Sequence, residues 1–143
     1  MQETSLGVTI REAIDNADVR SVSDVLRLKH LYEHGGVYTD VDVWPTRPFD
    51  KLVALSRREK AVIFGMESPD VVSNSVIISP FPKHPFLRWL LHNLPAWALL
   101  HGGRRACDRT GPKFVSAAVK WVMHSSLSPS SLRDHVLLVD HKT

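Results

Sequence analysis

The sequence predicts an α/β fold, in which helices pack against a β-sheet. A run with helical spacing of apolar residues stops at Gly35-Gly36 and leads directly into a β-branched and aromatic stretch, which is the pattern of an α/β connection. Further strand-like runs alternate with helix-like runs along the chain. At 143 residues with 43% hydrophobic residues, the chain is long enough for one domain with a core. We therefore expect residues 1–143 to form a single domain.

The first elements follow from local signals. Residues Thr9 to Ala17 predict a short helical turn. A stronger helix is expected to begin at Ser23, with the serine as N-cap and Asp24 in the first turn, where the helix dipole favours an acid. Gly35-Gly36 is expected to end this helix as a left-handed cap. The apolar face comprises Val25, Leu28, Leu31 and Tyr32.

A strand is predicted from Val37 to Val43 and is stopped by Pro45. Residues 22–44 therefore form a core unit of one helix and one strand. Two further strands are predicted at Ala61 to Met66 and Ser75 to Ser79.

The second half predicts two helices and a last strand. One helix covers Phe86 to Leu94, with Pro85 in its first turn, and is followed by loop and partial helix to Asp108. Another begins at Pro112. Residues 124–143 are expected to form a weakly defined tail with a strand at Val136 to Val139. The buried stripe of the helix from Pro112 comprises Phe114, Val115, Ala118, Val119 and Val122.

Composition excludes several classes of protein. The net charge is +3, but no Lys/Arg cluster alternates with aromatic residues, so we expect no nucleic-acid partner. A single cysteine, Cys107, excludes a disulfide framework and a cysteine-based zinc site, and the histidines lack the spacing of a metal site. No signal peptide, membrane-spanning stretch, Walker loop or nucleophile elbow is expected.

The acidic pair in Asp40-Val41-Asp42 is the strongest candidate site. Carboxylate oxygens suit a hard cation such as Mg²⁺ or Mn²⁺, and such a cation can hold a diphosphate and neutralise its charge. The alternative is a solvated turn without a ligand.

Residues near this pair have both a structural and a functional interpretation. Asp24 and Arg27 share one helix face, either as a surface ion pair of little energetic weight or as ligands of a sugar and a diphosphate. We expect Arg27 to be partly exposed, so that Arg27→Ala leaves the fold intact. Gly36 either caps the helix or lets a ligand approach the backbone closely. Tyr38 either packs in the core or at its rim, or stacks on the base or sugar ring of a ligand. Asn74 either forms a turn or contacts a sugar hydroxyl.

Together these residues resemble a known family. The run from Ser23 to Asp42 resembles the DXD-containing sugar-binding region of the glycosyltransferases, most closely the group of yeast initiating α-1,6-mannosyltransferases and mannosyl inositol phosphorylceramide synthases. The segments Val72 to Ser75, His84 to Leu87 and Thr110 to Phe114 resemble later blocks of that group and occur in the same order.

The resemblance implies a GT-A type, Rossmann-like fold that uses a nucleotide-sugar donor and a divalent metal, Mn²⁺ or Mg²⁺, with retention of configuration. Asp24 and Arg27 match positions that hold the donor sugar. Asp40 matches the acid that contacts ribose or metal-bound water, and Asp42 matches the direct metal ligand. Asn74 and the Gly111 turn match positions that line the cleft between donor and acceptor. No catalytic base or nucleophile is assigned.

The resemblance also implies partners. Mannose from GDP-mannose onto an inositol phosphorylceramide-like lipid is the leading expectation, and galactosyl transfer from a UDP-hexose to a glycolipid or glycan is the rival. Members of the group begin with a strand–helix–strand half that holds the base, and about twenty residues before the Asp24 helix are too few for it. The alternative is therefore a catalytically inactive remnant that serves as a sugar-binding or partner subunit. Relatives imply a Golgi or other endomembrane lumen in a eukaryote, the cytoplasm in a bacterium, and membrane association through segments outside this sequence.

Overall fold

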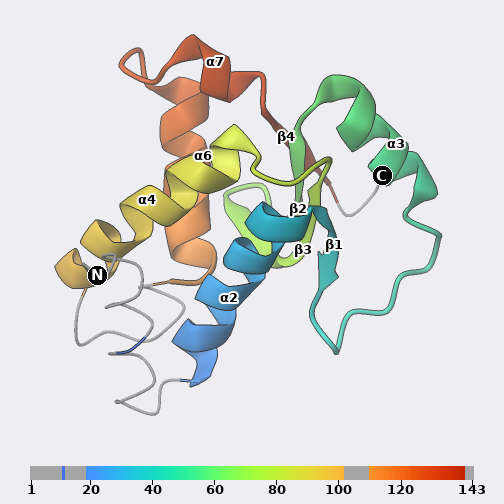
Figure 1. Ribbon diagram of the computed structural model, residues 1–143, viewed down its shortest axis with the longest axis horizontal. Coiled ribbons are helices and arrows are strands. Elements are labelled where there is room, and N and C mark those ends of the chain that lie inside the picture. The colour runs from blue at the N-terminus through green and yellow to red at the C-terminus, as the bar shows by residue number, and fades with distance from the viewer. Residues whose placement is uncertain (1–10, 12–18, 102–109, 141–143) are drawn as a thin grey trace.

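The computed structural model describes residues 11, 19–101 and 110–140 (Figure 1). The predicted turn at Thr9 to Ala17 falls almost wholly outside these residues. The α/β class is confirmed. In chain order the elements are α2 (Val19–His34), β1 (Gly36–Thr39), α3 (Asp50–Glu59), β2 (Val62–Ser68), β3 (Val71–Ser79), α4 (Pro85–Leu100), α6 (Pro112–His124), α7 (Ser130–Arg133) and β4 (Val136–Val139).

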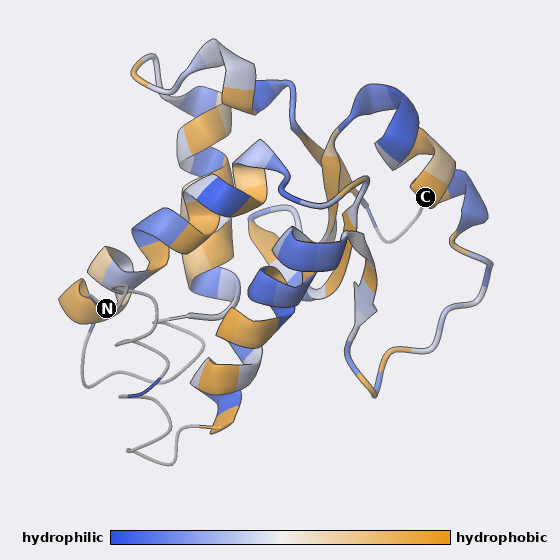
Figure 2. Ribbon diagram, viewed as in Figure 1, coloured by the Kyte–Doolittle hydropathy of each residue, from blue (hydrophilic) through white to orange (hydrophobic). Residues whose placement is uncertain are grey.

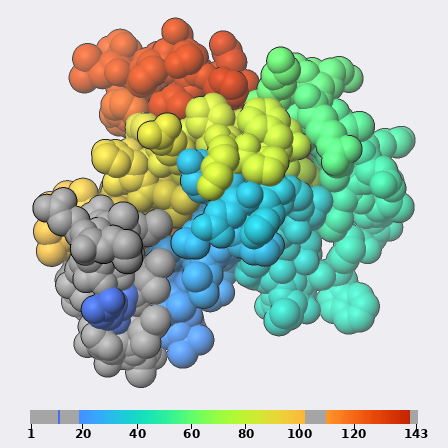
Figure 3. All heavy atoms as spheres, viewed as in Figure 1, coloured from blue at the N-terminus to red at the C-terminus, as the bar shows by residue number. Residues whose placement is uncertain are grey.

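The four strands form one mixed sheet in the order β1-β3-β2-β4. β3 pairs antiparallel with both β1 and β2, and β4 pairs parallel with β2. The long helices α2, α4 and α6 gather on one side, whereas α3 stands apart from them beside the other end of the sheet (Figure 1). In the space-filling view, α2 and α4 close over the near side of the molecule (Figure 3).

The hydrophobic core fills the space between the three long helices and the sheet. Polar and apolar stretches alternate along the ribbons of these helices (Figure 2), and their buried apolar side chains belong to one cluster with those of the sheet. The predicted faces of α2 and α6 are confirmed, since each of their aliphatic residues and Phe114 is at most 8% exposed. Each Val, Leu or Phe side chain among them stabilises the fold by about 1.5–3 kcal/mol relative to leaving it exposed. The largest fully buried members are Phe64, Phe86, Leu28, Leu31, Ile77, Ile78, Leu87, Leu90 and Leu94.

The boundaries of α2 correct one prediction and confirm another. The helix begins at Val19, so Ser23 is not the N-cap and Asp24 lies beyond the first turn. Half-buried Val22 lies one helical turn before Val25, and this extends the apolar face toward the N-terminus. The end was predicted correctly. Gly35 adopts φ 68° and donates its N–H to the Leu31 carbonyl at 2.8 Å.

β1 ends at Thr39, so the predicted strand to Val43 is too long. The Asp40 N–H still donates to the Ser75 carbonyl at 2.8 Å, and the Val43 N–H then donates to the Asp40 carbonyl at 3.1 Å. The acidic pair therefore lies in a turn that follows the strand, not in the strand. The prediction of one helix and one strand over residues 22–44 is therefore correct as far as Thr39, where β1 ends.

Three other elements differ from expectation. α3 was not predicted, β3 begins four residues before Ser75, and α4 continues through Pro95 to Leu100. The region 124–143, predicted as a weakly defined tail, contains α7 and an integral strand, β4. Within the part of the chain that the structure describes, no helix is long and apolar enough to cross a bilayer.

Candidate functional site

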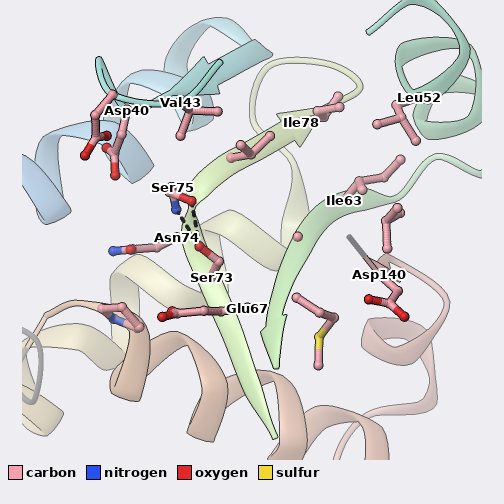
Figure 4. A pocket seen from close by; sticks show the side chains of 16 residues that line it. Asp40, Val43, Leu52, Ile63, Glu67, Ser73, Asn74, Ser75, Ile78 and Asp140 are labelled. Carbon is pink, nitrogen blue, oxygen red and sulfur yellow. Dashed lines mark hydrogen bonds between the residues drawn. The ribbon is translucent and has the colours of Figure 1, made fainter. Parts of the chain in front are cut away.

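A cleft of about 640 Å³ opens on the face of the sheet that lies away from the core (Figure 4). The assignment of the face follows from alternation along β2, because Val62 and Phe64 belong to the core while Ile63 and Gly65 line the cleft. Asp40 and Asp42 of the turn after β1 line the same cleft. The remaining polar or turn-forming residues at its wall are Glu67, Ser73, Asn74, Ser75, Pro112 and Asp140.

Arg27 of α2 connects the buried interior to the acidic turn. Its Nη1 lies 3.1 Å from Oδ1 of Asp40 and donates to the Asn74 carbonyl at 2.6 Å. Its Nη2 lies 3.2 Å from Oδ1 of Asp24, and its guanidinium carbon lies 4.7 Å from the centre of the Tyr38 ring. Arg27 is only 8% exposed, so the expectation of a partly exposed side chain was wrong. The predicted pairing with Asp24 is present, but it is buried.

Asp24 joins three elements. Its Oδ1 accepts from Nδ2 of Asn74 in β3 and its Oδ2 accepts from Oγ1 of Thr110 before α6, both at 2.9 Å. Burial raises the pKa of Asp24, and Arg27 together with these two donors partly opposes that shift. Both carboxylate oxygens thus have partners within the protein. The geometry favours a role for Asp24 in positioning Arg27 and Asn74, and its contact with a donor sugar remains a prediction.

The two acids of the turn differ in their surroundings. The Tyr38 hydroxyl donates to Oδ1 of Asp40 at 2.7 Å, and Asp40 also pairs with Arg27. Burial, followed by this hydrogen bond to a carboxylate, raises the pKa of Tyr38. Asp42 is exposed on the cleft wall. One carboxylate is therefore held in place by the protein, and the other is free to bind a ligand.

The two glycines predicted for the site are separated by the fold. Gly36 pairs with Ser79 at the far end of β1, about 13 Å of strand from Asp40, so the structure does not bring it to the cleft. It serves as a cap residue with φ 96°. Gly111 is the buried N-cap residue of α6 and lies beside Pro112, which lines the cleft.

Four polar residues of the cleft were not predicted as site residues from the sequence: Glu67, Ser73, Ser75 and Asp140. Glu67 shares the parity of Ile63 and Gly65 along β2, and that alternation is the signal that could have placed it on the open face. Ser73 lies at a place where β3 departs from regular pairing, which local sequence does not indicate.

The carboxylate oxygens of the acidic turn fit a hard divalent cation whose remaining ligands would come from the substrate. The turn offers the carboxylates of Asp40 and Asp42, and oxygen ligands suit Mg²⁺ or Mn²⁺. No group of three or more His, Cys, Asp or Glu side chains that could hold a metal occurs among the described residues. Two carboxylates plus substrate phosphates is a usual arrangement for Mg²⁺. The residues present therefore fit a cation shared with a diphosphate.

Comparison with solved structures supports the predicted type of fold. A chain described as "PaToxG Glycosyltransferase" superposes with a TM-score of 0.64 and 18% sequence identity, and the match covers 92% of this chain and 45% of that one. The likeness is one of fold, and it agrees with the predicted GT-A type α/β fold.

Sequence comparison finds related proteins. Residues 4–59 match the family described as "Glycosyltransferase sugar-binding region containing DXD motif". Inositol phosphoceramide mannosyltransferase 3 of Schizosaccharomyces pombe is 33% identical over 120 residues, 80% of this chain and 30% of that protein. Inositol phosphoceramide mannosyltransferase 1 of the same yeast is 37% identical over 71 residues, 50% of this chain and 21% of that protein. These matches support the predicted family, glycosyltransferases with a DXD-containing sugar-binding region, of which the chain carries part of a domain. The chain spans less than a third of the length of these curated relatives.

Proposed function

We propose that this chain forms part of a divalent-metal-dependent, retaining hexosyltransferase that takes mannose from GDP-mannose. The observation that carries the proposal is the acidic turn at the cleft, in which Asp40 is held by Arg27 and Tyr38 while Asp42 is exposed. A bound Mn²⁺ or Mg²⁺ would supply charge stabilisation for the departing nucleoside diphosphate. Asp42 would be its direct ligand.

The chain's own residues prepare this site. Arg27 and the Tyr38 hydroxyl fix the orientation of Asp40, so little side-chain freedom is lost when a ligand binds. Asn74, oriented by Asp24 and Arg27, lines the cleft, where its amide can contact a sugar hydroxyl. We assign no base or nucleophile.

The names of similar proteins support a class of acceptor. Two similar proteins are named inositol phosphoceramide mannosyltransferases, which supports mannosyl transfer to a sphingolipid of the inositol phosphorylceramide kind. A third, "Glucan organizing enzyme 1" of Cryptococcus neoformans, is 35% identical over 79 residues, 48% of this chain and 20% of that protein. A glycan acceptor, or a UDP-hexose donor such as UDP-galactose, is the rival assignment.

Isothermal titration tests donor and metal together. GDP-mannose, UDP-galactose and UDP-glucose are titrated with and without Mn²⁺ into the wild-type chain, Asp42→Asn and Asp70→Asn. Asp70 is the matched control because it is exposed in the β2–β3 turn and is not among the residues that line the cleft. We expect binding of GDP-mannose that requires Mn²⁺, falls at least tenfold in Asp42→Asn and is unchanged in Asp70→Asn. Absence of heat with every donor, from a folded wild-type chain, would contradict the proposal.

A second candidate is a catalytically inactive remnant that acts as a sugar-binding or partner subunit. It would use the same cleft and acidic turn for binding, without transfer. Radiolabelled GDP-mannose with inositol phosphorylceramide separates the two candidates. Metal-dependent donor binding without transfer supports the remnant, and transfer abolished by Asp42→Asn supports the enzyme.

A further inference from the structure

The strand β3 leaves regular pairing where it crosses the cleft. Phe64 of β2 pairs with Ile77, and the next pair is Met66 with Val72. Gly65 alone on β2 therefore stands opposite four residues of β3, 73–76. A bulge of this kind bends the strand and re-aims its side chains, and bulges are enriched beside active sites.

A second irregularity places Glu67. Met66 and Ser68 of β2 pair with Val72 and Val71, which are adjacent in β3, so Glu67 is the extra residue. Its side chain lines the cleft, on the face opposite Phe64 in the core. Glu67 is exposed, and it makes no hydrogen bond or ion pair with any residue that the structure describes. An ionised carboxylate is thus presented to the cleft with its acceptor sites open.

Hydroxyl groups line the same cleft as this carboxylate and are connected to the acidic turn by hydrogen bonds. Oγ of Ser73 and Oγ of Ser75 are 2.6 Å apart, and the Ser75 carbonyl accepts from the Asp40 N–H at 2.8 Å. Figure 4 shows Glu67 and Ser73 at the wall of the cleft that lies away from Asp40, with Ser75 between them and the acidic turn. Residues 73–75 of β3 therefore run from the wall of the cleft with Glu67 to the wall with the acidic turn.

The charge of Glu67 determines what can bind beside it. A carboxylate repels a diphosphate, so the phosphate end of a donor must lie at the Asp42 side, where a cation can offset the charge. Neutral hydroxyl groups, in contrast, donate to a carboxylate in strong charge-assisted hydrogen bonds. A carboxylate, a serine hydroxyl and the Asn74 amide on one wall suit a ring with adjacent hydroxyl groups.

We propose that Glu67 and Ser73 form a binding subsite for the hydroxyl groups of a neutral polyol, the part of the glycosyl acceptor that receives the sugar. The acceptor role rests on the proposed function, whereas binding of a polyol at Glu67 can be measured without it. Glu67 is a positioning residue in this assignment. The strand order supports the arrangement, because β1, β3 and β2 successively carry the acidic turn, Asn74 and Glu67.

Ligand-observed NMR titration with myo-inositol and methyl α-D-mannopyranoside tests the subsite in the chain as it exists. We expect saturable binding to wild type that weakens at least tenfold in the isosteric variant Glu67→Gln and is unchanged in Asp70→Asn. Gly65→Leu is a second variant, because a Cβ built at Gly65 meets nothing within 4 Å and Gly65 lines the cleft. Its side chain should project into the cleft and weaken binding of the probes.

The result that overturns the inference is no saturable binding of either probe to folded wild type, or binding to Glu67→Gln within twofold of wild type. Titration of GDP-mannose with Mn²⁺ distinguishes failure of the polyol subsite from failure of the proposed function. Donor binding should be unchanged in Glu67→Gln and lost in Asp42→Asn. Glu67-dependent polyol binding without any donor binding would refute the proposed function and leave the subsite. Equal loss of donor and polyol in Glu67→Gln would assign Glu67 to the donor sugar and overturn the acceptor assignment.

Discussion

Replacing Arg27 by methionine should destabilise the fold substantially, because the substitution leaves a buried carboxylate without its cation. Removing one partner of a buried ion pair costs about 3–5 kcal/mol. The side chains of Arg27 and Asp24 are 7% and 10% exposed, whereas that of Asp40 is 29% exposed and can be hydrated. Asp24 also keeps its donors Asn74 and Thr110. We therefore expect the lower end of the range, about 3 kcal/mol of unfolding free energy.

Urea denaturation followed by circular dichroism measures this change. With an m-value of about 2 kcal/mol/M, a loss of about 3 kcal/mol lowers the urea midpoint by about 1.5 M. The double variant Asp24→Asn/Arg27→Met should be more stable than Arg27→Met alone, because the uncompensated carboxylate is gone. Arg58→Met is the matched control, since Arg58 pairs with Glu59 on the surface with 73% of its side chain exposed.

We expect the unfolding free energy of Arg58→Met to stay within about 0.5 kcal/mol of that of wild type. A urea midpoint for Arg27→Met that matches the midpoint of this control would refute the reasoning. Arg27 would then contribute little to the stability of the fold, and its role would be limited to ligand binding.

Two other predictions concern stability. His84 is fully buried, its Nδ1 accepts from the Phe86 N–H, and burial lowers its pKa, so the folded state binds fewer protons than the unfolded state. Stability should therefore fall as pH drops below about 6.5, by up to about 1.4 kcal/mol per pH unit, and His84→Asn should flatten this profile in urea titrations at pH 7 to 5. Gly35→Ala should cost about 1–3 kcal/mol, because Gly35 has φ 68° and its Cβ would lie 3.0 Å from the Phe81 carbonyl carbon. Gly65→Ala should cost nothing by the same assay, and an equal loss in both variants would contradict this account.

The parts of the fold that local sequence determines could be predicted. The end of α2 depends on Gly35, whose left-handed conformation is set within one turn of the helix. The start of α6 depends on Pro112 in the same way. α3 was missed because it lies on the surface, and Ser56 is its one buried residue, so no apolar stripe marks it.

The geometry of the site depends on contacts between distant residues and could not be predicted. Arg27 is buried because it bonds to Asn74, 47 positions away, and because Asp24 bonds to Thr110, 86 positions away. The acidic turn was placed in a strand because β-branched residues continue to Val43. The regular pairing of β1 ends at the pair of Thr39 with Val76, where the bulge of β3 over residues 73–76 is reached. Residue type therefore indicated the chemistry, and pairing between strands determined its position.

The alternation along β2 also protects the sheet against misalignment. A shift of β2 by a single position would exchange its two faces, taking Phe64 into water and Glu67 toward the helices. An unpaired carboxylate in an apolar interior is strongly unfavourable. The same acid that faces the cleft thus penalises the wrong alignment during folding, and a neutral residue at position 67 would relax that penalty even where the native contacts stay unchanged.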